Sequence, residues 1–446
     1  MIQSEGAAGA RRPAPGVWID VSLLTLGKIA LGLYVLRIGF SHVSDDDYAR
    51  TVIAMQFAHA PKLDPSGTSW LPFPFWFLGG IMAIAGRSLT VSRTVSIALG
   101  AACAAAPYAA MRATGVERSA AVAGAALAMV LPWNAWLGVA MVPEGWTGAL
   151  VGAAMIATSN VRARPWVAAA LLVTSLSRYE AWPACVLFAA LCFARALAAR
   201  EREVKVRETT WALVAVAGPL AWMGWNEHAH GSALHFLTRV RSFRRATGAS
   251  ELGLSDKVFG YPRALSTETP EVAVLAALGT LSVVFDRRVR GRWRWSLAGV
   301  LAMLAFLVVG DVRDGAPTHH PVRALSPIWW VIAGLGADAM AQCLRRTGSM
   351  IRVTMTGALT AAALGWAISL PSRWRASPGR SDWDRRDPQL AAGFAMQKRG
   401  VSWAEITPCA YEHFALMAAW ARPERAQVNP GLHLPPSADC PRVVER

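Results

Sequence analysis

Long apolar runs recur along the whole chain of 446 residues, and they constrain its fold more than any other feature. A run of about 20 apolar residues is long enough to cross the hydrocarbon core of a bilayer as a helix. A backbone inside lipid must satisfy its own hydrogen bonds, which leaves helices or closed barrels. Hydrophobic residues make up 54% of the chain and charged residues 17%, below the roughly one quarter typical of soluble proteins. We therefore predict an all-α polytopic membrane protein.

The apolar runs place the predicted membrane helices. They lie at about 21–40, 70–86, 91–111, 119–137, 145–159, 166–176, 182–198, 211–225, 272–285, 295–309, 325–340 and 353–370. The acidic segments before residue 70 and after residue 137 can share one side of the membrane only if two of the three runs between them cross. The third would be re-entrant or interfacial. This leaves about 11 predicted crossings, with 1–370 as the membrane domain and 371–446 as a polar C-terminal segment.

The net charge of +16 sits mainly in short loops between the apolar runs. Cytoplasmic loops of membrane proteins carry an excess of Lys and Arg, so this charge predicts membrane orientation rather than nucleic-acid binding. Basic loops also suit anionic lipid head groups. No small-residue cleavage site follows the first apolar run, which indicates an uncleaved first helix. We expect a multi-pass protein of the bacterial inner membrane whose first outer loop, about 41–69, and C-terminal segment are extracytoplasmic.

Three consecutive carboxylates, Asp45, Asp46 and Asp47, follow the first predicted helix. Adjacent like charges repel unless water, cations or a basic substrate group offsets them. The segment after them, 48–59, has the spacing of a short amphipathic helix in the membrane interface. Two interpretations stand: the acids form the polar floor of an active site, or they belong to a solvated acidic loop.

Further polar residues are predicted at the same outer rim. They are Glu144, Arg178, Glu180, His319, His320 and Arg323. Proton-coupled transporters place acids near the bilayer midplane, whereas these border the apolar runs, which favours chemistry at the surface. A rim carboxylate can act as general base while Arg holds a leaving phosphate. The plainer alternatives are a helix-start acid for Glu144, a structural pair for Arg178 with Glu180, and solvated histidines.

The order of several short motifs resembles the GT-C superfamily of membrane glycosyltransferases, which includes protein O-mannosyltransferases and lipid A aminoarabinose transferases. In that superfamily an acidic pair in the first outer loop precedes an interfacial helix, a proline-aromatic segment and a Gly-x-Ser turn followed by Arg. A second outer acid and an Arg-x-Leu-x-Pro segment come later. The matching residues are Asp46-Asp47-Tyr48, Trp70-Leu71-Pro72-Phe73-Pro74, Gly86-Arg87-Ser88 with Arg93 and Ser96, Glu144 after Pro132, and Arg323-Ala324-Leu325-Ser326-Pro327.

This resemblance implies an inverting transfer of a sugar from a polyprenyl-phosphate donor to a lipid, glycan or protein acceptor. One carboxylate of Asp45 to Asp47, foremost Asp46, would deprotonate or orient the acceptor. Glu144 would position the acceptor or a metal, and Arg178 or Arg323 would neutralise the departing phosphate. The residues expected to bind substrate are Tyr48, Arg178, Glu180, His320 and Arg323. A triple Asp leaves the choice of base open, and the proline-aromatic segment lacks the Lys of some relatives.

Three further points stay open from the sequence. Hard oxygen ligands would suit Mg²⁺ or Mn²⁺, but nothing in the sequence requires a metal. A transporter or flippase of lipid-linked sugars is the alternative function, and a catalytically inactive relative is a third. Cys409 and Cys440 are either a disulfide or two free thiols, and the C-terminal segment around them is either a small α/β unit over the active face or a patch that binds an acceptor.

Overall fold

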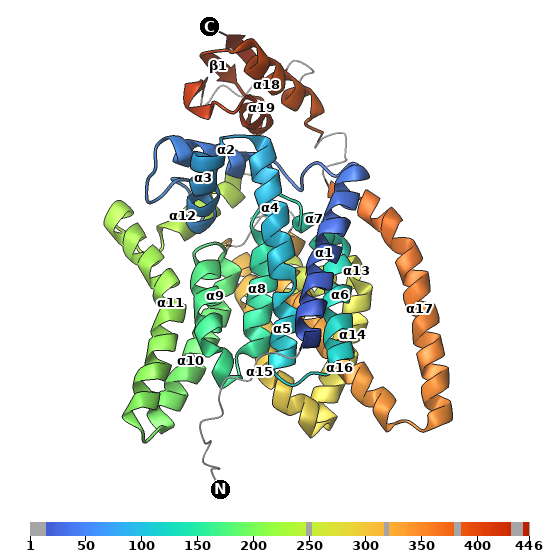
Figure 1. Ribbon diagram of the computed structural model, residues 1–446. Helices are drawn as coiled ribbons and strands as arrows, with labels where there is room; N and C mark the ends of the chain where they lie inside the picture. The colour runs from blue at the N-terminus through green and yellow to red at the C-terminus, as the bar shows by residue number, and fades with distance from the viewer. Residues whose placement is uncertain (1–14, 247–251, 316–320, 379–384, 430–439, 446) are drawn as a thin grey trace.

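The computed structural model describes residues 15–246, 252–315, 321–378, 385–429 and 440–445. The chain forms a helical bundle with a small α/β unit over one end (Figure 1). We call this end the acidic end, because it carries Asp45 to Asp47. The opposite, basic end holds the junction of α10 and α11 and the Arg-rich start of α15. The all-α membrane fold predicted from the sequence is confirmed for the bundle.

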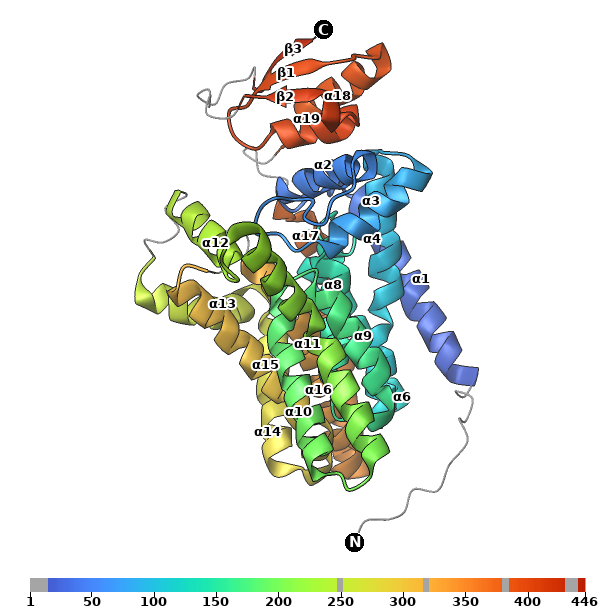
Figure 2. The same cartoon turned by 90° about the vertical axis from the view of Figure 1, so that its left-hand side faces the viewer.

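The first helix, α1 (Pro15–Arg37), begins earlier than predicted and leads to the acidic end. There α2 (Asp46–His59) and α3 (Phe73–Ala85) lie side by side across the end of the bundle (Figure 2). With 13 residues, α3 is about 20 Å long, shorter than the roughly 30 Å hydrocarbon core. A Cβ on its Gly79 would lie 2.8 Å from the Ala54 carbonyl oxygen of α2, so these helices touch closely. The run at 70–86 thus forms a helix too short for a full span, packed against α2 at the acidic end.

The chain then passes to and fro through the bundle. The elements in order are α4 (Leu89–Ala104), α5 (Ala106–Ala113), α6 (Arg118–Val130), α7 (Pro132–Leu137), α8 (Glu144–Ala157), η1 (Val161–Ala163), α9 (Arg164–Ser175), η2 (Tyr179–Ala181), α10 (Trp182–Ala198), α11 (Arg202–His230), α12 (His235–Ala246), α13 (Leu254–Glu268), α14 (Pro270–Phe285), α15 (Arg287–Val312), η4 (Pro321–Leu325), α16 (Ser326–Arg346) and α17 (Ser349–Arg375). Proline opens or closely precedes several of them, where its missing N–H costs no hydrogen bond.

Within the described ranges, six helices are long and apolar enough to cross a membrane. A seventh span results if α13 and α14, which meet at a bend of 106°, are counted as one. The predicted number of about 11 crossings is therefore not confirmed. Several other bundle helices are shorter than a full span; α8, for instance, has 14 residues.

Helix α16 is the centre of the bundle, and 83% of its apolar window is buried. Small residues of neighbouring helices let it pack closely: a Cβ on Gly124 of α6 would lie 2.8 Å from Gly334, and one on Gly152 of α8 would lie 2.8 Å from Trp330. Close approach at small residues is the usual basis of helix packing in membranes. Because η4 leads directly into α16, this packing also fixes the position of η4.

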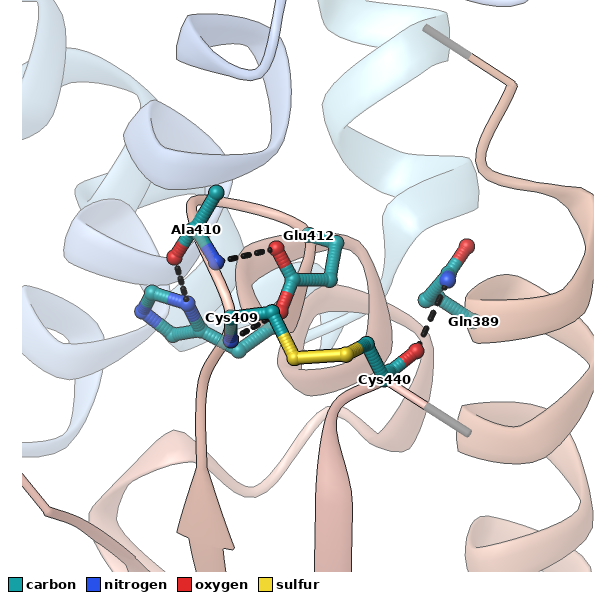
Figure 3. The surroundings of a disulfide bond; sticks show 6 residues. Gln389, Cys409, Ala410, Glu412 and Cys440 are labelled. Carbon is teal, nitrogen blue, oxygen red and sulfur yellow. Dashed lines mark hydrogen bonds between the residues drawn. A yellow bond between two sulfur atoms is a disulfide. The ribbon is translucent and has the colours of Figure 1, made fainter. Parts of the chain in front are cut away.

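The C-terminal α/β unit contains α18 (Asp387–Arg399), β1 (Ala404–Thr407), α19 (His413–Trp420), η6 (Pro423–Arg425), β2 (Ala426–Val428) and β3 (Arg442–Glu445). The strand order is β2-β1-β3, with β1 parallel to β2 and antiparallel to β3. Cys409 and Cys440 are joined as a disulfide between the loop after β1 and the start of β3 (Figure 3). Of the two alternatives for these cysteines, the structure has the disulfide.

This unit packs on α2, in the loop between α1 and α3. Leu416 and Trp420 of α19 share a buried apolar cluster with Tyr48 and Val52 of α2. An ion pair of 2.7 Å between Arg87, just before α4, and Glu424 of η6 adds a second connection. The acidic residues at the start of α2 are thus enclosed between the bundle and the C-terminal unit (Figure 2).

Candidate active site

Five charged side chains from distant parts of the sequence meet at the acidic end. Arg323 Nη2 lies 2.9 Å from Asp46 Oδ2, and Arg323 Nε lies 3.5 Å from Glu144 Oε1. Arg178 Nη1 lies 3.1 Å from the same Glu144 oxygen, and Arg178 Nη2 lies 2.5 Å from Glu180 Oε1. We call Asp46, Glu144, Arg178, Glu180 and Arg323 the acid–arginine cluster. The sequence analysis named all five, and the structure brings them together.

The ends of short elements position these side chains. Asp46 and Glu144 open α2 and α8, where a carboxylate also interacts favourably with the positive end of the helix dipole. Arg178 immediately precedes η2, which contains Glu180, and Arg323 lies within η4. The side chain of Glu144 is only 3% exposed and that of Arg323 only 5%. Charges buried this deeply are tolerated because each has partners of opposite sign.

The three consecutive aspartates have different environments. Asp45 accepts hydrogen bonds from Nε and Nη2 of Arg386, which precedes α18, at 2.7 and 2.8 Å. Asp47 is fully buried and accepts backbone N–H groups of Val43 at 3.0 Å and Met141 at 2.6 Å. Burial raises the pKa of the Asp47 carboxyl above its ordinary value. Asp46 belongs to the acid–arginine cluster, and its side chain stays 25% exposed.

Two predicted substrate-binding residues are placed differently or not described. Tyr48 is buried against the C-terminal unit, and its hydroxyl lies 3.3 Å from His42 Nδ1 rather than in the cluster. His320, like His319, falls outside the described residues.

The remaining motif residues hold the backbone around the cluster. Gly86 has φ 95°, a conformation that other residues rarely adopt, and Ser88 caps α4 by accepting the N–H of Val91. Arg93 donates to the carbonyl oxygens of Ser41 and Val139. These contacts connect the first outer loop to α4 and to the segment before α8.

One buried cation, Arg50, was not identified from the sequence. Its guanidinium carbon lies 4.4 Å from the ring centroid of Trp70 and 5.7 Å from that of Phe75. The residue is 4% exposed, and in the described part of the chain its Nε and Nη1 atoms have no hydrogen-bond partner. The sequence did contain one signal for Arg50. It lies four residues after Asp46, and residues at this spacing share a helix face.

Burial and neighbouring charges shift the ionisation of these groups in different directions. Burial lowers the pKa of Arg50 to about 10, so its guanidinium remains charged at neutral pH; Glu144 and Asp46 oppose the shift. Burial would also lower the pKa of Arg178, but the adjacent Glu144 and Glu180 raise it above its ordinary value. With Arg50 included, three cations face three carboxylates, so the charges balance.

Two small cavities border the start of α8. The first is lined by Glu144, Arg178, Glu180 and Arg323 and measures about 10 Å³, room for about one water molecule. A phosphate is larger than this space, so a substrate group that binds here must move some of the side chains that line it. The second, about 30 Å³, lies between α3 and α4 and has a mostly apolar lining that includes Phe77.

The described residues offer no clear set of ligands for the Mg²⁺ or Mn²⁺ considered from the sequence. Among the residues that the structure describes, no three His, Cys, Asp or Glu side chains are grouped so that they could hold a metal ion. Each carboxylate of the acid–arginine cluster already faces an arginine. We therefore derive no step through a metal.

The fold, a helical bundle with a small C-terminal unit over one end, is similar to that of ArnT, a GT-C-type aminoarabinose transferase. The crystal structure of ArnT from Cupriavidus metallidurans bound to undecaprenyl phosphate superposes with a TM-score of 0.51 and 16% sequence identity. The match covers 92% of this chain and 76% of the ArnT chain. No protein-family model matches the sequence, and no curated protein matches it. The predicted resemblance to the GT-C superfamily is thereby confirmed for the fold.

Proposed function

We propose that this protein is a GT-C-type glycosyltransferase that moves a sugar from a polyprenyl-phosphate carrier to an acceptor at the acidic end. The observation that carries the proposal is the acid–arginine cluster, in which a partly exposed carboxylate, Asp46, contacts a buried Arg323. Glycosyl transfer to a hydroxyl or amine needs a base for the acceptor and positive charge for the leaving phosphate. In this cluster the carboxylate of Asp46 and the guanidinium of Arg323 lie within hydrogen-bond distance of each other.

In the proposed reaction, an acceptor oxygen or nitrogen attacks the anomeric carbon from the face opposite the phosphate. The new bond to the sugar forms as the bond from the anomeric carbon to the phosphate oxygen breaks, and the acceptor proton passes to Asp46. The anomeric configuration is thereby inverted. Arg323 and Arg178 take up the negative charge of the released polyprenyl phosphate.

The ion pair between Asp46 and Arg323 connects donor binding to the proposed base. Arg323 Nη2 lies 2.9 Å from Asp46 Oδ2, so a donor phosphate that engages Arg323 competes with Asp46 for the same guanidinium. The Asp46 carboxylate is then free to take the acceptor proton. Glu144, which also faces Arg178 and Arg323, keeps the two guanidinium groups in place.

A lipid carrier is supported by two features. The ArnT structure with the similar fold is bound to undecaprenyl phosphate. The apolar cavity between α3 and α4 also borders Pro143 and Trp146 at the start of α8, so a lipid chain that enters by widening this cavity would have its phosphate near Glu144. The acceptor is a lipid, a glycan or a protein, and a requirement for Mg²⁺ or Mn²⁺ is left to experiment.

The acidic end is proposed to face away from the cytoplasm of a bacterial cell. The Arg-rich starts of α11 and α15 lie at the opposite end, as the excess of basic residues in cytoplasmic loops leads us to expect. The disulfide between Cys409 and Cys440 suits an oxidising compartment.

Mass spectrometry of glycolipids and glycoproteins from cells with and without this chain tests the proposal. A glycoform should disappear without the chain and return with the wild type, but not with Asp46→Asn. Glu227→Gln is the matched control. It changes an exposed carboxylate near the last turn of α11, which lies toward the acidic end of the bundle. An enzyme reconstituted in vesicles releases free polyprenyl phosphate; a flippase would move the intact lipid-linked sugar instead, which would overturn the proposal.

A further inference from the structure

Three arginines lie at the acid–arginine cluster, but only two of them make ion pairs within it. Arg178 and Arg323 contact the carboxylates of Asp46, Glu144 and Glu180. Arg50 makes no ion pair among the described residues, and its Nε and Nη1 atoms are buried without a hydrogen-bond partner there. A buried charged donor without an acceptor is unfavourable. The arrangement is therefore suited to an acceptor that the described residues do not supply.

The position of the Arg50 guanidinium is set by neighbours on two sides. Trp70, in the loop before α3, and Phe75 on α3 hold it by cation–π contacts of 4.4 and 5.7 Å. The charged groups that act on it most strongly are Glu144, Arg178, Asp46 and Arg323. An aromatic surface that fixes a guanidinium without consuming its N–H groups leaves those groups available to a ligand.

The geometry points to Arg50 as the residue that binds a phosphoryl oxygen of the lipid carrier through its unpaired N–H groups. This inference rests on the proposed function and adds to it the contact that receives the phosphate. Arg178 and Arg323 must exchange protein carboxylates for the phosphate, whereas Arg50 has donors ready before the donor lipid arrives. In this arrangement Arg50 mainly determines affinity for the carrier.

The carrier is favoured over a phosphorylated acceptor because of where the aromatic residues lie. Phe75 holds Arg50, and its neighbours Pro74 and Phe77 line the apolar cavity between α3 and α4. One short helix thus contacts both the cation and the cavity. A lipid chain that enters by widening this cavity would therefore lie against the same helix that holds Arg50.

Binding of farnesyl phosphate to the purified full-length protein in nanodiscs tests the inference. Farnesol, which lacks the phosphate, and inorganic phosphate, which lacks the chain, separate the two parts of recognition. We expect Arg50→Gln to weaken the binding of farnesyl phosphate at least about tenfold and to leave farnesol unaffected. Arg50→Lys keeps the charge but not the planar group. Its binding of farnesyl phosphate should be weaker than that of the wild type and tighter than that of Arg50→Gln. Arg294→Gln is the control, because Arg294 also lies over a tryptophan, at 5.4 Å, but starts from the basic end.

The possible results are distinguishable. If the wild type binds farnesyl phosphate and a well-folded Arg50→Gln variant binds it equally well, the inference is wrong while the proposed function stands. If the wild type binds no prenyl phosphate, the carrier in the proposed function is wrong, and the inference fails with it. Trp70→Leu keeps the cation but removes its aromatic support, and weaker binding there would support the inference even if Arg50→Gln does not fold. If inorganic phosphate binds the wild-type protein more tightly than farnesyl phosphate does, the site takes a free or acceptor phosphate and the inference is wrong.

Discussion

The carboxylate of Asp46 lies 2.9 Å from the guanidinium of Arg323, although 277 positions separate the two residues in the sequence. This contact joins the first outer loop to η4 and so to the central helix α16. It places a candidate base directly beside a candidate phosphate ligand. The chemistry of one residue therefore depends on what occupies the other.

Asp46→Asn removes the proposed base and nearly preserves its shape. We expect transfer to fall by about 10²–10⁴-fold, the usual contribution of a general base. Asp45→Asn should have a much smaller effect, because Asp45 binds Arg386 of the C-terminal segment instead of the cluster. Sugar transfer measured in membranes with equal amounts of each variant checks this. Equal losses in the two variants would remove the distinction drawn between these aspartates.

Glu144→Gln leaves Arg178 and Arg323 with less opposing charge in a buried site. Removing one partner of a buried ion pair costs about 3–5 kcal/mol, so we expect a clear fall in thermal stability as well as in activity. Glu117→Gln breaks an ion pair with Arg345 whose side chain is 53% exposed, and exposed pairs contribute only about 0–1 kcal/mol. Thermal unfolding in detergent compares the two. A neutral effect of Glu144→Gln would show that the cluster tolerates an uncompensated arginine.

How much of the site was predictable depended on the residue. Glu144, Arg178 and Arg323 lie at the ends of apolar runs. Where these ends are on the same side of the membrane, their residues lie at the same membrane surface. The separate environments of Asp45, Asp46 and Asp47 were not predictable, because successive helical residues point about 100° apart and only tertiary contacts decide which face is buried. Arg50 was missed because a cation on an interfacial helix is ordinarily solvated, and its burial depends on Trp70 and Phe75.

The fold was predictable in class but not in detail. Apolar length indicated membrane helices, yet it could not separate a short interfacial helix from a span in the run at 70–86. The close contact of Gly79 with α2 places α3 beside that helix, and it is a property of the packed structure. The individual strands of the C-terminal sheet could not be predicted, since β2 has three residues and β3 four, too few to give a pattern.

Asp47→Ala should destabilise the first outer loop rather than the chemistry. The Asp47 carboxylate accepts three backbone N–H groups, those of Val43, Ser44 and Met141. Each buried donor left unpaired costs about 1–3 kcal/mol. We expect lower thermal stability and faster proteolysis near residues 41–47. Asp47→Asn keeps one acceptor oxygen and should lie between wild type and Asp47→Ala; the reverse order would contradict the structural role.

Replacing both Cys409 and Cys440 by Ser should loosen the C-terminal unit. A disulfide that closes a loop of this size, with 31 positions between its cysteines, contributes about 2–4 kcal/mol. The turn beside it is held by Glu412, which accepts the N–H groups of Cys409 and Ala410 (Figure 3). Because α19 packs on α2, faster hydrogen exchange should appear in both helices. Cys343→Ser, at an exposed free cysteine, should leave exchange in α2 unchanged.

The interfacial position of α3 can be tested by the side from which its two ends are labelled. Lys62 precedes α3 and Thr90 follows it, and both are exposed at the acidic end. In a Cys343→Ser background, Lys62→Cys and Thr90→Cys should react with a membrane-impermeant maleimide added outside intact cells. Ser119→Cys, at the start of α6 and the basic end, should react only after the membrane is opened. If α3 crossed the membrane, Lys62→Cys and Thr90→Cys would be labelled from opposite sides. One further crossing between Asp46 and Glu144 would place these two residues on opposite sides of the membrane. The acid–arginine cluster could then not form.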